Sequence, residues 1–204
     1  MSDYPAPQMV EVRKVQTRKP SLATAKAYPI KFGLIEQVYI PGNFKLGKDA
    51  SRASMRYEKI GDSKVYIQFR KKVLNRPEAR MFGDNLSHVS TYTINDSDLE
   101  SLGPIIEHRA DPSLFRIEKA TAGRMIGRSE IQITGVDLKT NSRERALYAV
   151  IGNILQEVVF HAPASTYEQQ KQAFSIVART LEWQRTTQRP SEVEEHIDDL
   201  RDPF

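Results

Sequence analysis

Apolar and polar positions in the second half of the chain predict a β-hairpin that leads into a helix. The segments ALYAVIG and ILQEVVFHAP, residues 146–152 and 154–163, are two apolar strands. Gly152-Asn153 lies at their junction and suits a two-residue hairpin turn. Residues 165–184 follow with helical periodicity. We expect this hairpin and helix to form the core of the fold.

The expected helix begins with a capping box, Ser165-x-x-Glu168. One apolar stripe should face the sheet and consists of Phe174, Val177, Ala178 and Leu181. A second stripe consists of Ala173, Ile176, Thr180 and Trp183. The second stripe indicates a thick core, and the alternative is a partner surface. Under that alternative, Ile176 and Trp183 are candidate partner-binding residues.

An earlier hairpin is predicted by the alternation of residues 51–60 and 64–73 around Gly61-Asp62-Ser63. Its apolar face carries Ala53, Met55, Tyr57, Val65, Ile67 and Phe69. Its opposite face, which carries Tyr66, Gln68 and Arg70, is predicted to point to solvent. These three residues are further candidate partner-binding residues.

Four other segments complete the expected fold. A strand should run from Ile30 to a turn at Pro41-Gly42, and residues 74–90 should break the sheet as loops. Cap candidates at 95–98 and Pro104 predict a broken helix. Residues 114–120 and 129–138 are expected to be strands. The prediction is an α+β fold with a mainly antiparallel, twisted sheet flanked by helices.

Three regions are expected along the 204 residues. Residues 1–29 are predicted to be an extended basic arm because prolines interrupt them, and residues 30–184 a single α+β domain. Residues 185–204 are rich in acids and are predicted to be a tail.

Composition excludes several classes of protein. The chain has no cysteine, which excludes disulfides, thiolate nucleophiles and cysteine-ligated metals. It has no apolar run of about 18 residues, and its first 25 residues lack the apolar centre of a signal peptide. We therefore expect a cytoplasmic protein with no membrane span.

Charge is divided unevenly along the chain. Residues 1–80 carry 17 Lys and Arg against 7 Asp and Glu, whereas residues 81–204 carry 13 against 19. Lys64, Tyr66, Phe69, Arg70, Lys71 and Lys72 place aromatic rings among cations, as single-stranded nucleic-acid-binding proteins do. Because Phe69 alternates to the apolar face, only Tyr66 should be exposed beside these cations. Nucleic-acid binding is therefore an alternative that we do not favour.

Motifs for catalysis or metal binding are weak. The four histidines fall in separate segments without metal-ligand spacing, and no serine stands in a hydrolase motif. His161 should be a hydrogen-bonded structural imidazole at a strand end. Ser90-Thr91-Tyr92 with Glu192-x-Glu194 gives a faint mono-ADP-ribosyltransferase pattern, which is the weakest alternative. We expect no catalytic residue, no metal and no cofactor.

The segments NILQEVVFHAP and YEQQKQAFSIVARTLEW, within residues 128–183, resemble the PsbP-like α/β/α sandwich proteins. That group includes the Ran guanine-nucleotide release factor, DcrB-type proteins and the Eag adaptor chaperones of type VI secretion. The resemblance implies a protein-binding module. This chain differs from DcrB-type lipoproteins because it has no cysteine for lipid attachment.

The resemblance and the absence of catalytic motifs together favour a non-enzymatic protein-binding module. More specifically, we expect an adaptor or chaperone for a bacterial secreted effector. Its partner would be an apolar or amphipathic segment of a protein client, held on the sheet or against the last helix. The sequence also allows a homodimer.

Overall fold

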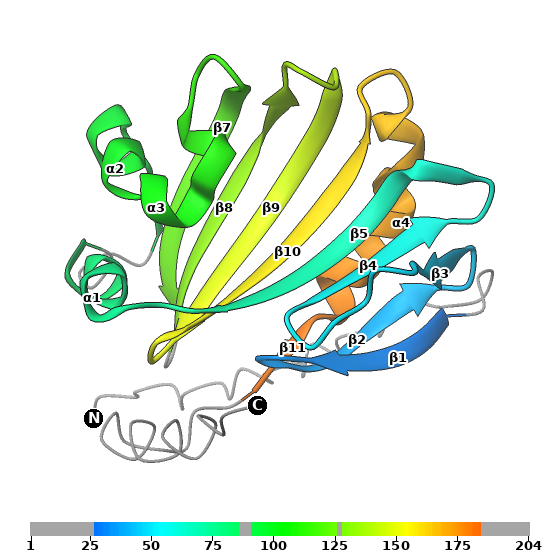
Figure 1. Cartoon of the computed structure of the whole chain (residues 1–204), viewed down its shortest axis with the longest axis horizontal. Helices are drawn as coiled ribbons and strands as arrows, with labels where there is room; N and C mark the ends of the chain where they lie inside the picture. The colour runs from blue at the N-terminus through cyan, green and yellow to red at the C-terminus, as the bar shows by residue number, and fades with distance from the viewer. Residues whose placement is uncertain (1–26, 86–90, 126–127, 185–204) are drawn as a thin grey trace, which may run out of the picture.

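An eight-stranded antiparallel sheet forms the centre of the molecule (Figure 1). The fold is described from a computed structural model, for residues 27–85, 91–125 and 128–184. The strand order is β3-β4-β5-β10-β9-β8-β7-β6. The bounds are β3 (Phe44–Leu46), β4 (Ser54–Lys59), β5 (Asp62–Val73), β10 (Ile154–Pro163), β9 (Ser142–Ile151), β8 (Arg128–Asp137), β7 (Phe115–Met125) and β6 (Thr91–Thr93).

The predicted hairpin at residues 146–163 is confirmed and lies in the middle of this sheet. β9 and β10 pair from Ile151↔Ile154 to Ser142↔Pro163, around the expected turn at Gly152-Asn153. β10 also pairs with β5, which is why every residue from Leu155 to Ala162 is buried. The earlier hairpin is confirmed as β4 and β5, with Val65, Ile67 and Phe69 on its buried face.

Short helices cover one face of the sheet toward its β7 end (Figure 1). The predicted broken helix is confirmed as α2 (Asp96–Ser101) and α3 (Gly103–Ile106), followed by the 3-10 turn η1 (Glu107–Ala110). Asn95 and Asp98 form a capping box at the start of α2. The buried side chains of α3 and of Leu102 before it pack on β7, β8 and β9 in one apolar cluster. This cluster includes Leu102, Ile105, Ile106, Phe115, Ile131, Ile133 and Tyr148.

The prediction of loops at residues 74–90 is wrong in part, because a helix, α1 (Arg76–Asn85), forms there. The Asn75 side chain accepts a hydrogen bond from the Glu78 amide at 2.9 Å, and the Glu78 carboxylate accepts one from the Asn75 amide at 2.9 Å. This reciprocal pair caps the helix and allows Pro77 in its first turn.

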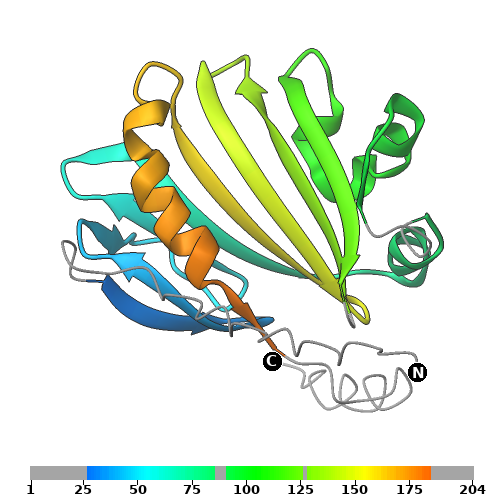
Figure 2. The same ribbon diagram turned by 180° about the vertical axis from the view of Figure 1, so that it is seen from behind.

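The other face of the sheet is covered by α4 (Tyr167–Thr180) and by a second sheet of three strands (Figure 2). The second sheet has the order β1-β2-β11, with β1 (Ala27–Phe32), β2 (Ile35–Pro41) and β11 (Glu182–Trp183). Their shared apolar cluster includes Ile35, Val38, Ile40, Phe69, Val158, Phe160, Phe174 and Val177. The predicted α+β fold with helices on both sheet faces is confirmed.

The single strand expected from Ile30 is instead a hairpin of β1 and β2. Gly33 makes the turn with φ of +58°, a conformation that favours glycine. The Leu34 amide next to it donates to Oε1 of the buried Gln156 at 3.2 Å. A Cβ atom on Gly33 would overlap that same oxygen. The turn is therefore held against β10 by a contact that only a glycine permits.

The expected helix at residues 165–184 is too long at both ends. Thr166 is the N-cap and makes no side-chain cap hydrogen bond, so the predicted Ser165 capping box does not form. Leu181 has an extended backbone, and Trp183 lies in β11, paired with Ile35 of β2. The helix ends early because the next residues hydrogen-bond as a strand.

The boundaries expected for the basic arm and the acidic tail remain predictions. β1 begins at Ala27, inside the range expected for the arm. The rest of the arm and the tail lie outside the described residues. None of the described helices is long and apolar enough to span a membrane.

Candidate functional site

A cluster of charged residues is buried on the face of the sheet that α3 and η1 cover. Glu144 and Tyr148 of β9 and Glu157 and His161 of β10 point to this face, as their cross-strand pairing requires. All four are buried, and each carries an ionisable group. Such groups are costly to bury without partners, so their contacts identify the site.

Arg109 of η1 supplies those contacts. Its side chain is only 3% exposed. It donates to Glu144 Oε2 from Nε at 2.9 Å and from Nη2 at 2.6 Å. Its Nη1 donates to the Tyr148 hydroxyl at 2.7 Å and to Glu157 Oε1 at 2.8 Å. One guanidinium thus satisfies two carboxylates and a phenol.

Arg70 of β5 extends the network toward solvent. It is ion-paired with the other oxygen of Glu157 and, at 3.2 Å, with Glu107 of η1. The backbone of Glu107 has φ of +55° and ψ of −125°, which is unusual for a residue with a side chain. This bend separates α3 from η1 and precedes the two residues, His108 and Arg109, that reach the sheet.

The network changes the pKa values of its members. Burial alone would raise the pKa of Glu144, but His108 and Arg109 lower it to about 2. Burial alone would lower the pKa of Arg109, whereas Tyr148, Glu144 and Glu157 raise it. Burial raises the pKa of Tyr148. Glu144 is therefore ionised and Tyr148 protonated near pH 7.

Two histidines lie near Glu144, one beside each oxygen of its carboxylate. His108 Nε2 is 3.7 Å from Oε2, and His161 Nε2 is 3.9 Å from Oε1. His161 Nδ1 is 2.9 Å from the Lys64 carbonyl oxygen, which confirms the expected hydrogen-bonded imidazole. Burial lowers the pKa of His161.

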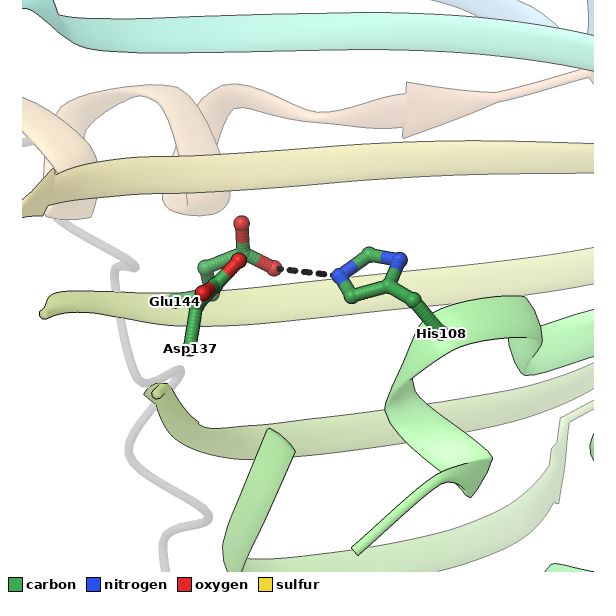
Figure 3. Close-up of side chains that lie close together, drawn as sticks. All are labelled: His108, Asp137 and Glu144. Carbon is green, nitrogen blue, oxygen red and sulfur yellow. Dashed lines mark ion pairs between the residues drawn. The ribbon is translucent and has the colours of Figure 1, made fainter. Parts of the chain in front are cut away.

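Asp137, at the end of β8, lies beside His108 and Glu144 (Figure 3). One potential metal-ligand atom from each of the three lies within 4.8 Å of the others. These residues come from η1, β8 and β9, so the sequence gives them no ligand spacing.

Three of the five predicted partner-binding residues lie together beside this network. Tyr66, Gln68 and Arg70 share the side of β5 that faces η1, and all three are partly exposed. Arg56 of β4 lies 3.8 Å above the Tyr66 ring, and His161 of β10 stacks on that ring at 4.2 Å. Gln68 donates to Ser54 Oγ at 3.1 Å. We call Ser54, Arg56, Tyr66, Gln68 and Arg70 the open face.

The other two predicted residues, Ile176 and Trp183, lie on the far side of the sheet. Both are partly buried. Trp183 packs against the cluster shared by α4 and the small sheet, and so does Ala173. Thr180 Oγ1 accepts a hydrogen bond from the Tyr39 amide at 3.1 Å. The second stripe is therefore not one helical surface, because Trp183 is in a strand and Thr180 is bonded to β2.

The remaining sequence patterns do not gather at the site. Phe69 is fully buried on the opposite face of β5, so it is not available for stacking on a base. In the mono-ADP-ribosyltransferase pattern, Ser90, Glu192 and Glu194 lie outside the described residues. Sequence reasoning missed Arg109, Glu144 and Glu157. The sequence offered one indication of this cluster: Glu144 in β9 and Glu157 in β10 are charged residues within strands that are otherwise largely apolar.

Comparisons with known proteins bear on the fold. No family model matches the chain, and no curated protein does. The solution structure of cyanobacterial PsbP (CyanoP) from Synechocystis sp. PCC 6803 matches with a TM-score of 0.52 and 9% identity, over 80% of this chain and 96% of that one. A crystal structure from Bacteroides thetaiotaomicron VPI-5482 matches with a TM-score of 0.40 and 13% identity, over 85% and 57%.

The match to CyanoP extends over nearly all of that protein. At 9% identity it is a likeness of fold, not of site residues. The resemblance found in residues 128–183 is confirmed at this level: the chain has a PsbP-like fold.

Proposed function

We propose that this chain is a non-enzymatic protein-binding module that holds a segment of a client protein on the open face. The more specific proposal is an adaptor or chaperone for a bacterial secreted effector. The single observation that carries the binding proposal is the uneven cover of the sheet. Within the part of the chain that the structure describes, α2 and α3 lie over the β7 end of one face of the sheet, and no helix lies over β4 and β5 on that face (Figure 1).

The uncovered part has the chemistry of a binding surface. Its side chains include Tyr66, Arg56 and Arg70, and tyrosine and arginine are enriched among residues that dominate binding energy. Each is already held by neighbours: Tyr66 by His161, Arg56 by Glu58 at 3.3 Å, and Arg70 by Glu157 and Glu107. Because these side chains are pre-ordered, a client would lose less of its binding energy to ordering them.

The same surface narrows the choice of client. A purely apolar segment would desolvate Arg56, Gln68 and Arg70 without giving them hydrogen-bond acceptors. An amphipathic segment with acidic or amide groups on one side supplies those acceptors. We therefore favour the amphipathic client of the two considered from the sequence.

Photo-crosslinking from inside the cell tests this proposal. A crosslinking amino acid in place of Gln68 should capture one defined protein, whereas the same amino acid at Gln169, exposed on α4, should not. With the purified client, Gln68→Glu should weaken binding, because it places a carboxylate opposite the client's acidic groups, and Gln169→Glu should not. Capture of a secreted effector supports the specific role. Capture of only a second copy of this chain, or equal capture from both positions, contradicts the proposal.

A further inference from the structure

We propose that His108, Asp137 and Glu144 bind one divalent transition-metal ion of the zinc class. The proposal is independent of the client-binding role. It begins from the convergence of an imidazole and two carboxylates within 4.8 Å (Figure 3). Imidazole and carboxylate together are ligands for zinc and neighbouring divalent ions, whereas calcium and magnesium prefer oxygen ligands alone.

The fold places the two carboxylates on the same side of the sheet. Asp137 pairs with Ser142 across the β8–β9 turn, and Glu144 lies two positions further along β9. Asp137 Oδ1 accepts the Lys139 and Thr140 amides, each at 2.9 Å. Glu144 is oriented by Arg109. Both carboxylates are thus held in place by groups outside the proposed ligand set, as metal ligands commonly are.

Electrostatics also favour a cation at this position. Arg109 pairs with Glu144, and a second carboxylate, Asp137, lies close to Glu144 without an ion pair to Arg109 among the contacts of the described residues. Like charges at such distances repel unless a cation lies between them.

The distances suit a small ion. Zinc bonds of about 2.0–2.1 Å in a tetrahedron put neighbouring ligand atoms about 3.4 Å apart. His108 Nε2 and Glu144 Oε2 are 3.7 Å apart, close to that spacing. Because Oε2 also accepts two hydrogen bonds from Arg109, an ion bound there would share this oxygen with the guanidinium. The His108 side chain is 37% exposed, which gives an ion a route from solvent.

Metal titration of the full chain tests this site. After treatment with a chelator, the protein should take up Zn²⁺ in a saturable one-to-one manner by calorimetry. Co²⁺ should give the visible absorption of a low-coordinate site, and excess Mg²⁺ should not compete. His108→Ala and Asp137→Asn should each weaken Zn²⁺ binding by at least about tenfold. Asp137→Asn keeps the side-chain oxygen that accepts the turn amides, so it should fold normally.

Asp111→Asn is the matched control, because Asp111 is an exposed carboxylate next to η1 outside the ligand group. It should bind Zn²⁺ like the unmodified chain. The proposal is overturned if the unmodified chain shows no saturable uptake. It is also overturned if uptake survives both His108→Ala and Asp137→Asn, since the ion then binds elsewhere.

Discussion

Arg109 is the residue on which three buried partners depend. Its guanidinium satisfies Glu144, Glu157 and Tyr148, none of which has much access to water. A buried ion pair of this kind need not stabilise a fold relative to an apolar core, but the loss of one member leaves the others uncompensated. Arg109 is therefore a sharper test of the network than any of its partners.

Replacing Arg109 with methionine should lower the free energy of unfolding by about 3–5 kcal/mol, because Glu144 loses its buried guanidinium partner and Glu157 keeps only Arg70. Urea unfolding followed by circular dichroism measures the change. Arg116→Met is the control, since Arg116 is exposed on β7 and should matter by less than about 0.5 kcal/mol. Equal effects of the two substitutions would contradict the network described here.

Glu144 should make stability depend on acid pH. Its pKa is about 2 in the fold against an ordinary value of 4.5. Because the folded value is the lower one, its contribution is fully present above pH 4.5 and is lost as pH falls toward 2. The difference corresponds to about 3 kcal/mol. Urea unfolding at pH 6 and pH 3 in chelator should show a smaller loss in Glu144→Gln than in the unmodified chain. The same loss in both would assign the acid sensitivity to other groups.

At the scale of elements, the contact between β7 and β8 brings η1 to the sheet. Phe115 at the start of β7 packs over Gly135 of β8 and meets His108 edge-on at 5.9 Å. A Cβ atom on Gly135 would overlap the Phe115 ring and the Arg116 carbonyl oxygen. The absence of a side chain at Gly135 therefore sets how closely Phe115, and with it His108, approaches β9.

Gly135→Ala should cost about 1–3 kcal/mol of stability, as overpacking of a core does. It should also shift the NMR signals of the His108 ring. In Gly103→Ala the added Cβ atom would meet only Ala110, at 3.6 Å, an ordinary contact. That variant should melt at or above the temperature of the unmodified chain. If the two variants melt alike, the packing of Phe115 on Gly135 is looser than described.

At the scale of the whole molecule, the uneven charge of the chain bears on the nucleic-acid alternative. The open face combines cations with carboxylates that pair with them, including Arg56 with Glu58 and Arg70 with Glu157. The Tyr66 ring is in contact with a side chain from each neighbouring strand. The surface is therefore less basic, and offers less free aromatic area, than residues 1–80 suggest.

Binding to single-stranded DNA should accordingly be weak and should fall steeply with added salt, because each phosphate contact releases a counterion. Lys71 and Lys72 are exposed on β5, and replacing both with alanine should reduce the salt slope by about 2. Fluorescence anisotropy at several salt concentrations measures this. Tight binding at physiological salt that disappears in the double variant would make nucleic acid the better partner.

The sequence by itself determined the elements whose cause is local. Alternation predicted the β4–β5 hairpin, and two apolar runs around Gly152-Asn153 predicted the β9–β10 hairpin. The cap candidates at residues 95–98 and Pro104 predicted α2 and α3. These depend on neighbouring residues, which a sequence displays directly. The resemblance in residues 128–183 predicted the PsbP-like fold correctly.

Only the tertiary structure decided the features that depend on distant partners. Trp183 became a strand residue because β2 offered an edge, and the turn at Gly33 is held by Gln156, far along the chain. The cluster of Arg109, Glu144 and Glu157 joins η1 to β9 and β10, while each residue alone has the appearance of a surface charge. No spacing in a sequence reports such a meeting, because burial and pairing across a sheet are set by the whole fold.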